Sequence, residues 1–406
     1  MKKLISMLLV LTMALCLFAG CANNKPEGTQ GNNNSNVKIG VILIGDENEG
    51  YTYAHIKGIR DALANVGLTE SNVIFKYTVG EDDKCYDAAC DLVDQGCQLI
   101  ISNSYGHQSH MQRAASENSD ITFISMTGDS AATSGLANFK NAFTHVFQSR
   151  YISGVVAGLK LKEMMDNGEV TDPRVGYVGA FPFAEVKSGY TAFLLGIQSI
   201  VPEAYMDVYF TNSWFSITDE GAAAESLIAR GCVIIGQHAD STGAPQACEA
   251  ARKEGKNVYS VGYNVDMLSV APTAALVSAT NDWSVYYTYA FTCLLENKTI
   301  DTDWAKGYEV GAVGITKLGD SCAAGTAEKV AQVEAALKDG SLHVFDTSKF
   351  TVGGQNLTTC IVDLTGDYDT DDAGDKEAIW DGYFHESELR AAPSFALDID
   401  GINLLN

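Results

Sequence analysis

Short apolar runs alternate with amphipathic segments from residue 37 onward. The apolar runs 37–44, 73–77, 98–102 and 121–126 have the length and the β-branched content of buried strands. Between them, residues 53–66, 86–95 and 107–118 carry apolar side chains at helical spacing. This alternation predicts βαβ units, and therefore a parallel sheet that is covered by helices on both faces.

A second series of the same kind follows. It predicts helices at 149–165, 185–200, 218–229 and 244–253, strands at 174–179, 205–211, 232–236 and 257–262, and then a strand at 275–279 and a helix at 283–296. We therefore expect an α/β protein with two doubly wound parallel-sheet lobes in tandem and a late element that returns to the first. Because ligands of such sheets bind beyond the carboxyl ends of the strands, the facing lobes predict a ligand cleft.

The pattern also divides the chain into domains. We assign residues 37–148 and 279–304 to an N-terminal lobe, and residues 149–278 and 305–360 to a C-terminal lobe, joined by a hinge. Residues 361–406 are assigned to an acidic tail region.

The first residues have the parts of a secretory signal peptide. Lys2 and Lys3 precede an apolar run over residues 4–17, and Phe18-Ala19-Gly20 lead into Cys21. Small residues ahead of a cysteine resemble the bacterial lipobox, in which the cysteine is lipidated. The alternatives are an ordinary signal peptide or a short membrane helix, although the run is short for a span. We predict a signal peptide over 1–20 and a lipid anchor on Cys21, which would hold the protein at the extracytoplasmic face of the cell membrane.

Residues 21–36 predict a flexible linker, because they are rich in Asn, Gly, Ser, Gln and Pro and contain no large apolar side chain. The formal net charge of −24 argues against nucleic acid and against an anionic membrane surface as partners. Of the ten cysteines, none forms a CxxC pair, which excludes zinc-ribbon and thioredoxin motifs.

Motifs of catalysis and of metal binding are missing from the sequence. No nucleophile elbow, phosphate loop or HExxH occurs, so we expect no enzyme activity and no cofactor. His107 and His110 lack a third metal ligand of matching spacing, and the acidic stretch 363–375 lacks the Gly and Glu that a calcium loop requires. We therefore expect no metal site.

Seven short motifs occur in order, six of them directly after predicted strands and one in the helix that crosses between the lobes. They are Gly50-Tyr51-Thr52-Tyr53, Ser104-Tyr105-Gly106-His107, Arg150-Tyr151-Ile152-Ser153-Gly154, Gly179-Ala180-Phe181-Pro182 with Glu185, Asn212-Ser213-Trp214, Gln237-His238-Ala239-Asp240-Ser241, and Gly262-Tyr263-Asn264-Val265-Asp266-Met267. Over about residues 37–318 the chain thus resembles the substrate-binding lipoproteins of ABC importers in the basic membrane protein (purine nucleoside receptor) group. The resemblance implies a fold like that of type I periplasmic binding proteins. It also implies a monomer that closes on a purine nucleoside or a related ligand, and ABC permease and ATPase subunits as partners.

Aromatic and polar residues at the predicted strand ends suit a purine. Tyr51, Phe181 and Trp214 are candidates for stacking on the base, with a core position as the alternative. The expected ligand-binding set also contains polar side chains that can read the base edge and two further aromatic residues: His238, Asp240, Asn264, Asp266, Tyr105 and Trp283. For Asp240 and Asp266 the alternative is loop or cap chemistry.

Two departures from the family bear on the ligand. Nucleoside-binding members usually have an Asp where this chain has Thr127, and a Lys after the strand that is followed here by Asn281-Asp282-Trp283. In the family these charged residues help to hold the ribose. The patterns SWxxxxxE and QHxDSTxxP, matched by Ser213-Trp214 with Glu220 and by residues 237–245, belong to the branch associated with free bases such as adenine. We therefore expect a purine base ahead of a nucleoside.

Other classes of function remain open at this point. The same two-lobed fold also serves as a ligand-sensing receptor domain that signals to a membrane kinase, and the sequence does not separate the two. A purine-processing enzyme such as a nucleoside hydrolase would need clustered carboxylates near the first strand. That part of the chain offers only Asp46, Glu47 and Glu49.

Overall fold

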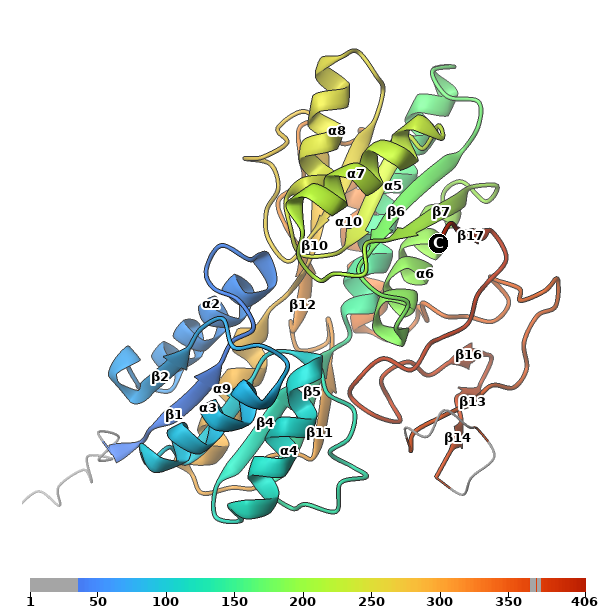
Figure 1. Cartoon of the computed structure of the whole chain (residues 1–406). Helices are drawn as coiled ribbons and strands as arrows, with labels where there is room; N and C mark the ends of the chain where they lie inside the picture. Colours follow the sequence, from blue (N-terminus) through green and yellow to red (C-terminus); the bar gives the residue numbers. More distant parts are fainter. Residues whose placement is uncertain (1–35, 366–369, 371–373) are drawn as a thin grey trace, which may run out of the picture. The chain divides into compact units, whose positions relative to one another are not determined.

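Two parallel sheets, each covered by helices on both faces, make up most of this computed structural model (Figure 1). The structure describes residues 36–365, 370 and 374–406, so the predicted signal peptide, Cys21 and nearly all of the predicted linker lie outside the described residues. Residues Val37–Asn406 form one unit. Within the described part of the chain, no helix combines the length and the apolar character needed to cross a membrane.

The first sheet has six parallel strands in the order β11-β5-β4-β3-β1-β2. In chain order they are β1 (Ile39–Ile42), β2 (Val73–Lys76), β3 (Leu99–Ser102), β4 (Thr122–Met126), β5 (Phe139–Thr144) and β11 (Asp303–Lys306). The first four lie within runs that the pattern predicts as strands. The sequence pattern predicts neither β5 nor β11.

Helices cover both faces of the first sheet because its strands are apolar on both sides. Ile39, Val41 and Ile101 share one core with α2 and α9, whereas Ile100 and Phe123 share another with α3 and α4. The helices are α2 (Gly50–Asn65), α3 (Asp83–Asp94), α4 (Gln108–Glu117) and α9 (Trp283–Leu295), with short 3₁₀ turns at Glu70–Asn72 and Tyr105–His107.

The second sheet has seven strands in the order β12-β10-β9-β8-β6-β7-β17, and all neighbours are parallel except β12 against β10. The strands are β6 (Arg174–Gly179), β7 (Tyr205–Phe210), β8 (Ile234–His238), β9 (Tyr259–Tyr263), β10 (Ala275–Asn281), β12 (Val313–Ile315) and β17 (Ile402–Leu404). The helices are α5 (Val146–Asp166), α6 (Ala184–Gln198), α7 (Ile217–Ala229), α8 (Gly243–Lys253) and α10 (Thr326–Lys338). The predicted α/β class with two parallel sheets is confirmed.

Two glycines allow α5 and α6 to pack closely. A Cβ atom on Gly154 would lie 2.1 Å from the carbonyl oxygen of Phe193, and one on Gly196 would lie 2.1 Å from that of Tyr151. No side chain fits at such distances, so both positions require glycine. The contact fixes α5, which follows the first crossing between the sheets, against the helix whose first turn carries Glu185.

The chain crosses between the sheets after β5, after β10 and after β11. The strands that precede these crossings end at Thr144, Asn281 and Lys306.

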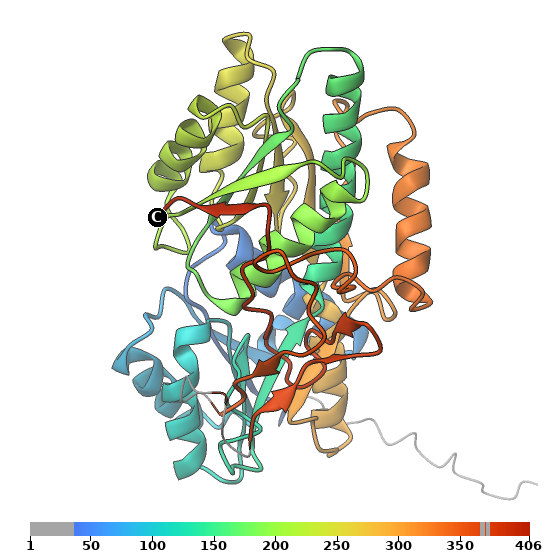
Figure 2. The ribbon, with the colours of Figure 1, turned by 90° about the vertical axis from the view of Figure 1, so that its right-hand side faces the viewer.

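The residues assigned to an acidic tail region are packed against the body, which the sequence pattern does not predict. The hairpins β13 (Ile361–Val362) with β14 (Lys376–Glu377) and β15 (Ile379–Trp380) with β16 (Tyr383–Phe384) precede β17. Figure 2 shows this C-terminal segment running across the molecule, with β17 at the edge of the second sheet.

Candidate functional site

A cavity lies where the carboxyl ends of the two sheets face each other. The space between its walls amounts to about 400 Å³, part of which is open to solvent. Both lobes contribute walls. The lining residues are Ile44, Glu49, Tyr51, Asn103, Ser104, Tyr105 and Thr127 from the first lobe, and Glu185, Trp214, His238, Asp240 and Tyr263 from the second.

Tyr51 stands at the start of α2, directly after β1, and is held from behind by the core. Its hydroxyl donates to the main-chain oxygen of Asn103 at 2.5 Å, and its ring meets the edge of His55 at 4.5 Å between ring centroids. The His55 ring in turn stacks on Trp283 at 4.3 Å. Tyr51 is therefore a fixed aromatic wall of the cavity.

Trp283 does not line the cavity. Its side chain is 1 % exposed and belongs to the core between α2, α9 and the first sheet. The expectation that Trp283 belongs to the ligand-binding set is thus wrong, because a layer formed by His55 and Tyr51 separates it from the site.

A buried polar cluster lies on the second-lobe side. Arg150, 2 % exposed, extends from α5 with its guanidinium 3.6 Å above the Tyr263 ring, and its Nη1 donates to the main-chain oxygen of Gln237 at 2.6 Å. The Nε and Nη2 atoms of Arg150 have no hydrogen-bond partner among the described residues. Next to it, His238 Nε2 and Glu185 Oε1 are 3.2 Å apart.

Burial decides the charge states in this cluster. It raises the pKa of Glu185 to about 7, although the positive charge of Arg150 acts in the opposite direction. Burial, together with the same positive charge, lowers the pKa of His238 well below its ordinary value. Near neutral pH His238 is therefore uncharged, and Glu185 is divided between a carboxylate and a carboxylic acid, which can both donate and accept.

Asp240 ends a chain of buried hydrogen bonds. Asn264 Nδ2 donates to Asp240 Oδ1 at 3.0 Å, Asn281 Nδ2 donates to Asn264 Oδ1 at 3.1 Å, and Thr144 Oγ1 donates to Asn281 Oδ1 at 2.5 Å. Burial, reinforced by neighbouring acidic groups, holds the pKa of Asp240 well above its ordinary value. Asn281 ends β10 and Thr144 ends β5, so this row of hydrogen bonds connects the cavity to two of the crossings between the lobes.

Trp214 lies in the loop after β7 and is tied to the loop of Asp240. The main-chain oxygen of Trp214 accepts from the Asp240 amide at 2.8 Å. The buried Glu220 accepts from the amides of Ser216 and Ser241, both at 3.1 Å. The SWxxxxxE pattern therefore has a structural basis: its Glu joins the two loops that present Trp214 and Asp240.

Phe181 and Asp266 lie outside the cavity lining. Phe181 stacks on Phe183 at 5.1 Å and meets the edge of Trp214 at 5.1 Å, so it supports the tryptophan from behind. The exposed Asp266 accepts from the amide of Leu268 at 2.7 Å, which is turn chemistry. Asn264 reaches the cavity only through Asp240.

The structure brings together Tyr51, Tyr105, Trp214, His238 and Asp240, all expected from the sequence. Other side chains at or beside the cavity are not in the expected ligand-binding set, among them Glu49, Thr127, Arg150, Glu185 and Tyr263. Arg150 and Glu185 do leave a signal, since each is an acid or base among apolar residues in a helix that packs into the core.

Comparison with known proteins bears on what this site belongs to. Residues 37–342 match the sequence model of the Bmp family, described as "ABC transporter substrate-binding protein PnrA-like". The chain is 28% identical over 314 residues to a purine-binding protein of Brucella abortus, which covers 76% of this chain and 83% of the relative. It is 29% identical over 253 residues to a putative ABC transporter glucose-binding protein of Haloferax volcanii, covering 62% and 60%.

Solved structures share the fold. An ABC transporter solute-binding protein from Aeropyrum pernix superposes with a TM-score of 0.63 at 13% identity, covering 76% of this chain and 93% of the other. A transcriptional activator of the comK gene from Bacillus halodurans gives 0.61 at 16% identity, covering 75% and 99%. At these identities the likeness concerns the fold alone.

Proposed function

Because this chain belongs to the Bmp family of PnrA-like ABC transporter substrate-binding proteins, we propose that it captures a purine, and a free base ahead of a nucleoside, in the cavity between its sheets. The observation that carries the proposal is the composition of the cavity wall. Tyr51, Tyr105 and Trp214, from three different segments and both lobes, adjoin the partly buried Glu185 and the buried Asp240.

Each part of this wall suits a heteroaromatic base. Aromatic side chains stack on a purine and contribute about 1–3 kcal/mol per stacked base. The edge of a purine presents ring-nitrogen acceptors beside N–H donors. A carboxylic acid matches such an edge, since it donates through one oxygen and accepts through the other. The raised pKa values of Glu185 and Asp240 favour that protonated form.

The residues at the positions where family members hold a ribose support a free base as the ligand. Thr127 lines the cavity without a charge. The carboxylate of Asp129, two residues later, is engaged by Tyr105, Gln108 and Arg390. Asn281 is one of the residues after the strand where family members usually have a Lys. Its side-chain amide is already hydrogen-bonded to Thr144 and Asn264. A buried sugar would leave hydroxyl groups unpaired, at about 1–3 kcal/mol each.

Calorimetric titration tests the proposal. The panel contains adenine, hypoxanthine, adenosine and guanosine, and glucose because of the name of the Haloferax relative. We expect adenine to bind at least about tenfold more tightly than adenosine, a difference of about 1.4 kcal/mol. Tighter binding of the nucleosides than of the bases would overturn the preference for a free base. Binding of glucose and of no purine would overturn the proposal of a purine ligand.

A matched pair of variants tests the stacking. Trp214→Ala should reduce the free energy of adenine binding by about 1–3 kcal/mol. Phe215→Ala removes the next aromatic ring, which is 40% exposed and does not line the cavity, and should leave adenine affinity unchanged. Equal losses in both variants would show that the effect is not stacking.

Membership of the family indicates where the protein acts, since an ABC substrate-binding protein works on the extracytoplasmic side. There it delivers its ligand to a permease that is coupled to an ATPase. Our proposal adds a lipid anchor at Cys21, on the strength of the lipobox-like segment and the polar linker. Cys21→Ala should move the folded protein from the membrane fraction to the soluble fraction. Retention of the intact variant in the membrane fraction would refute the anchor.

A further inference from the structure

The last part of the chain, residues 376–406, is called the C-terminal strap here. It lies beyond the region that matches the family, which ends at residue 342. The strap is built on the second lobe: Phe384, Phe395 and Ile399 belong to that lobe's core, and β17 pairs with β7. Lys187 of α6 also pairs with Asp398 of the strap at 2.6 Å.

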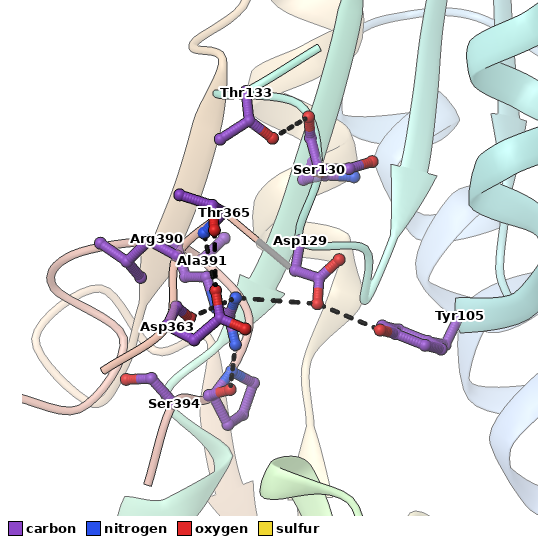
Figure 3. A network of polar contacts seen from close by, with 12 residues as sticks. Tyr105, Asp129, Ser130, Thr133, Asp363, Thr365, Arg390, Ala391 and Ser394 are labelled. Carbon is purple, nitrogen blue, oxygen red and sulfur yellow. Dashed lines mark hydrogen bonds and ion pairs between the residues drawn. The ribbon is translucent and has the colours of Figure 1, made fainter. Parts of the chain in front are cut away.

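In its middle the strap reaches the first lobe. The amide of Ala391 donates to Asp303 Oδ1, at the start of β11, at 2.8 Å. The neighbouring Arg390 places Nη1 3.8 Å from Asp129 Oδ2, in the loop between β4 and β5 (Figure 3). The pair is shielded from solvent, since the two side chains are only 14% and 22% exposed. One segment of the second lobe therefore holds the first lobe by a hydrogen bond and an ion pair.

The same ion pair continues to the wall of the ligand cavity. Asp129 Oδ2, which faces Arg390, accepts from the hydroxyl of Tyr105 at 3.1 Å (Figure 3). The other carboxylate oxygen, Oδ1, accepts from Gln108 Nε2 at 3.0 Å. Arg390 is itself fixed within the C-terminal segment, because it donates to the main-chain oxygens of Asp363 at 3.3 Å and Pro393 at 3.4 Å. Tyr105 lines the ligand cavity.

We propose that Arg390 is a positioning residue of the ligand site, which holds Tyr105 through Asp129 and fastens the two lobes over a bound ligand. The identity of the ligand in this inference rests on the proposed function, whereas the contact between Arg390 and Asp129 does not. Arg390 and Asp129 belong to different lobes, so they separate when the lobes part. An interaction made in one conformation shifts the population toward that conformation. Because the protein without ligand also samples this arrangement of the lobes, the contact slows ligand release strongly and ligand entry only slightly.

Hydrogen exchange without any ligand tests the contact itself. Asp129→Asn removes the charge that faces Arg390 from the first lobe and leaves the sequence of the strap intact. Asp381→Asn removes one charge from an exposed position of the strap and serves as the matched control. We expect faster exchange in the peptide that contains Ala391 in Asp129→Asn only. Unchanged exchange there would overturn the lobe-to-lobe contact.

Stopped-flow release of adenine tests the effect on the site. Arg390→Gln and Asp129→Asn should each speed release by about three- to tenfold, with entry rates within about twofold, and the double variant should be no faster than the singles because both act on one interaction. Lys349→Gln, which removes one exposed positive charge outside the strap, should match the unmodified protein. Additive effects, or release rates equal to that of Lys349→Gln, would overturn the positioning role.

The two measurements separate this inference from the proposed function. If no purine binds, the proposed function fails, and the exchange at Ala391 still decides whether the strap joins the lobes. If adenine binds and its release is unaffected in both variants, the proposed function stands and the positioning role of Arg390 is refuted.

Discussion

At the residue scale, the protonation of the Glu185 carboxyl group links the structure of the site to its proposed ligand. Glu185 lies beside the uncharged imidazole of His238, and burial raises its pKa to about 7. Below that pH the group is a carboxylic acid, which can donate to a ring nitrogen of a neutral base. Above it the group is a carboxylate, which only accepts.

Adenine affinity should therefore fall as the pH rises through about 7. If the protonated form of Glu185 is the one that binds, affinity is highest below its pKa and decreases by about tenfold between about pH 6 and about pH 8. Glu185→Gln keeps a donor and an acceptor at every pH, so its affinity should vary less over this range. Calorimetry at several pH values measures both profiles. An affinity that increases with pH in the unmodified protein would show that the carboxylate is the binding form.

At the scale of elements, the pairing of α5 with α6 positions the second-lobe side of the site. Arg150 lies one turn before Gly154 on α5, and Glu185 lies in the first turn of α6. The close approach of the two helices at Gly154 and Gly196 fixes the spacing between these charged groups.

Gly154→Ala should destabilise the protein. The added Cβ would overlap the carbonyl oxygen of Phe193, and overpacking of this kind costs about 1–3 kcal/mol or more. Gly221→Ala, in the middle of α7, places its Cβ no closer than 3.7 Å to other atoms and should be neutral or stabilising by up to about 1 kcal/mol. Urea unfolding of both variants gives the comparison. Equal stability of the two would contradict the close contact of α5 and α6.

At the scale of the whole molecule, the site is made of two halves that the crossings keep in register. The ends of β1, β3 and β4 supply one wall, and those of β6, β7, β8 and β9 supply the other. Neither wall alone encloses a ligand, so capture requires the lobes to approach each other, a common response of binding proteins with this architecture.

Small-angle scattering should show a smaller radius of gyration with saturating adenine than without it, because closure brings the lobes together. Trp214→Ala at the same adenine concentration should contract less, in proportion to its weaker binding. An unchanged radius of gyration after binding has been confirmed by calorimetry would rule out closure as the capture mechanism.

The sequence by itself determined the α/β class, the two sheets and the strand ends at which the ligand cavity lies. Those features follow from local periodicity, because alternating or continuous apolar positions record which side of an element is buried. The predicted helix over 218–229 and the predicted strand over 121–126, which the structure has as α7 and β4, needed no long-range information. The family motifs contain Tyr51, Trp214, His238 and Asp240, which the structure brings together in the wall of one cavity.

Only the tertiary structure decided the features that depend on remote partners. β5 contains Lys140 and Asn141, which look exposed in the sequence but are buried because Thr302, Ser125 and Ala131 satisfy their polar atoms. Which way a side chain on a predicted element points is likewise set by its neighbours, as Trp283 in the core shows.

The C-terminal strap makes the same point over the longest separation. β17 pairs with β7 although about two hundred residues lie between them in the chain, and Arg390 meets Asp129 across an even longer stretch of sequence. Local periodicity carries no record of such pairs, since each partner alone reads as an ordinary polar or short apolar segment. Their free energy arises only when folding brings both lobes and the strap together, so the tertiary structure alone could reveal them.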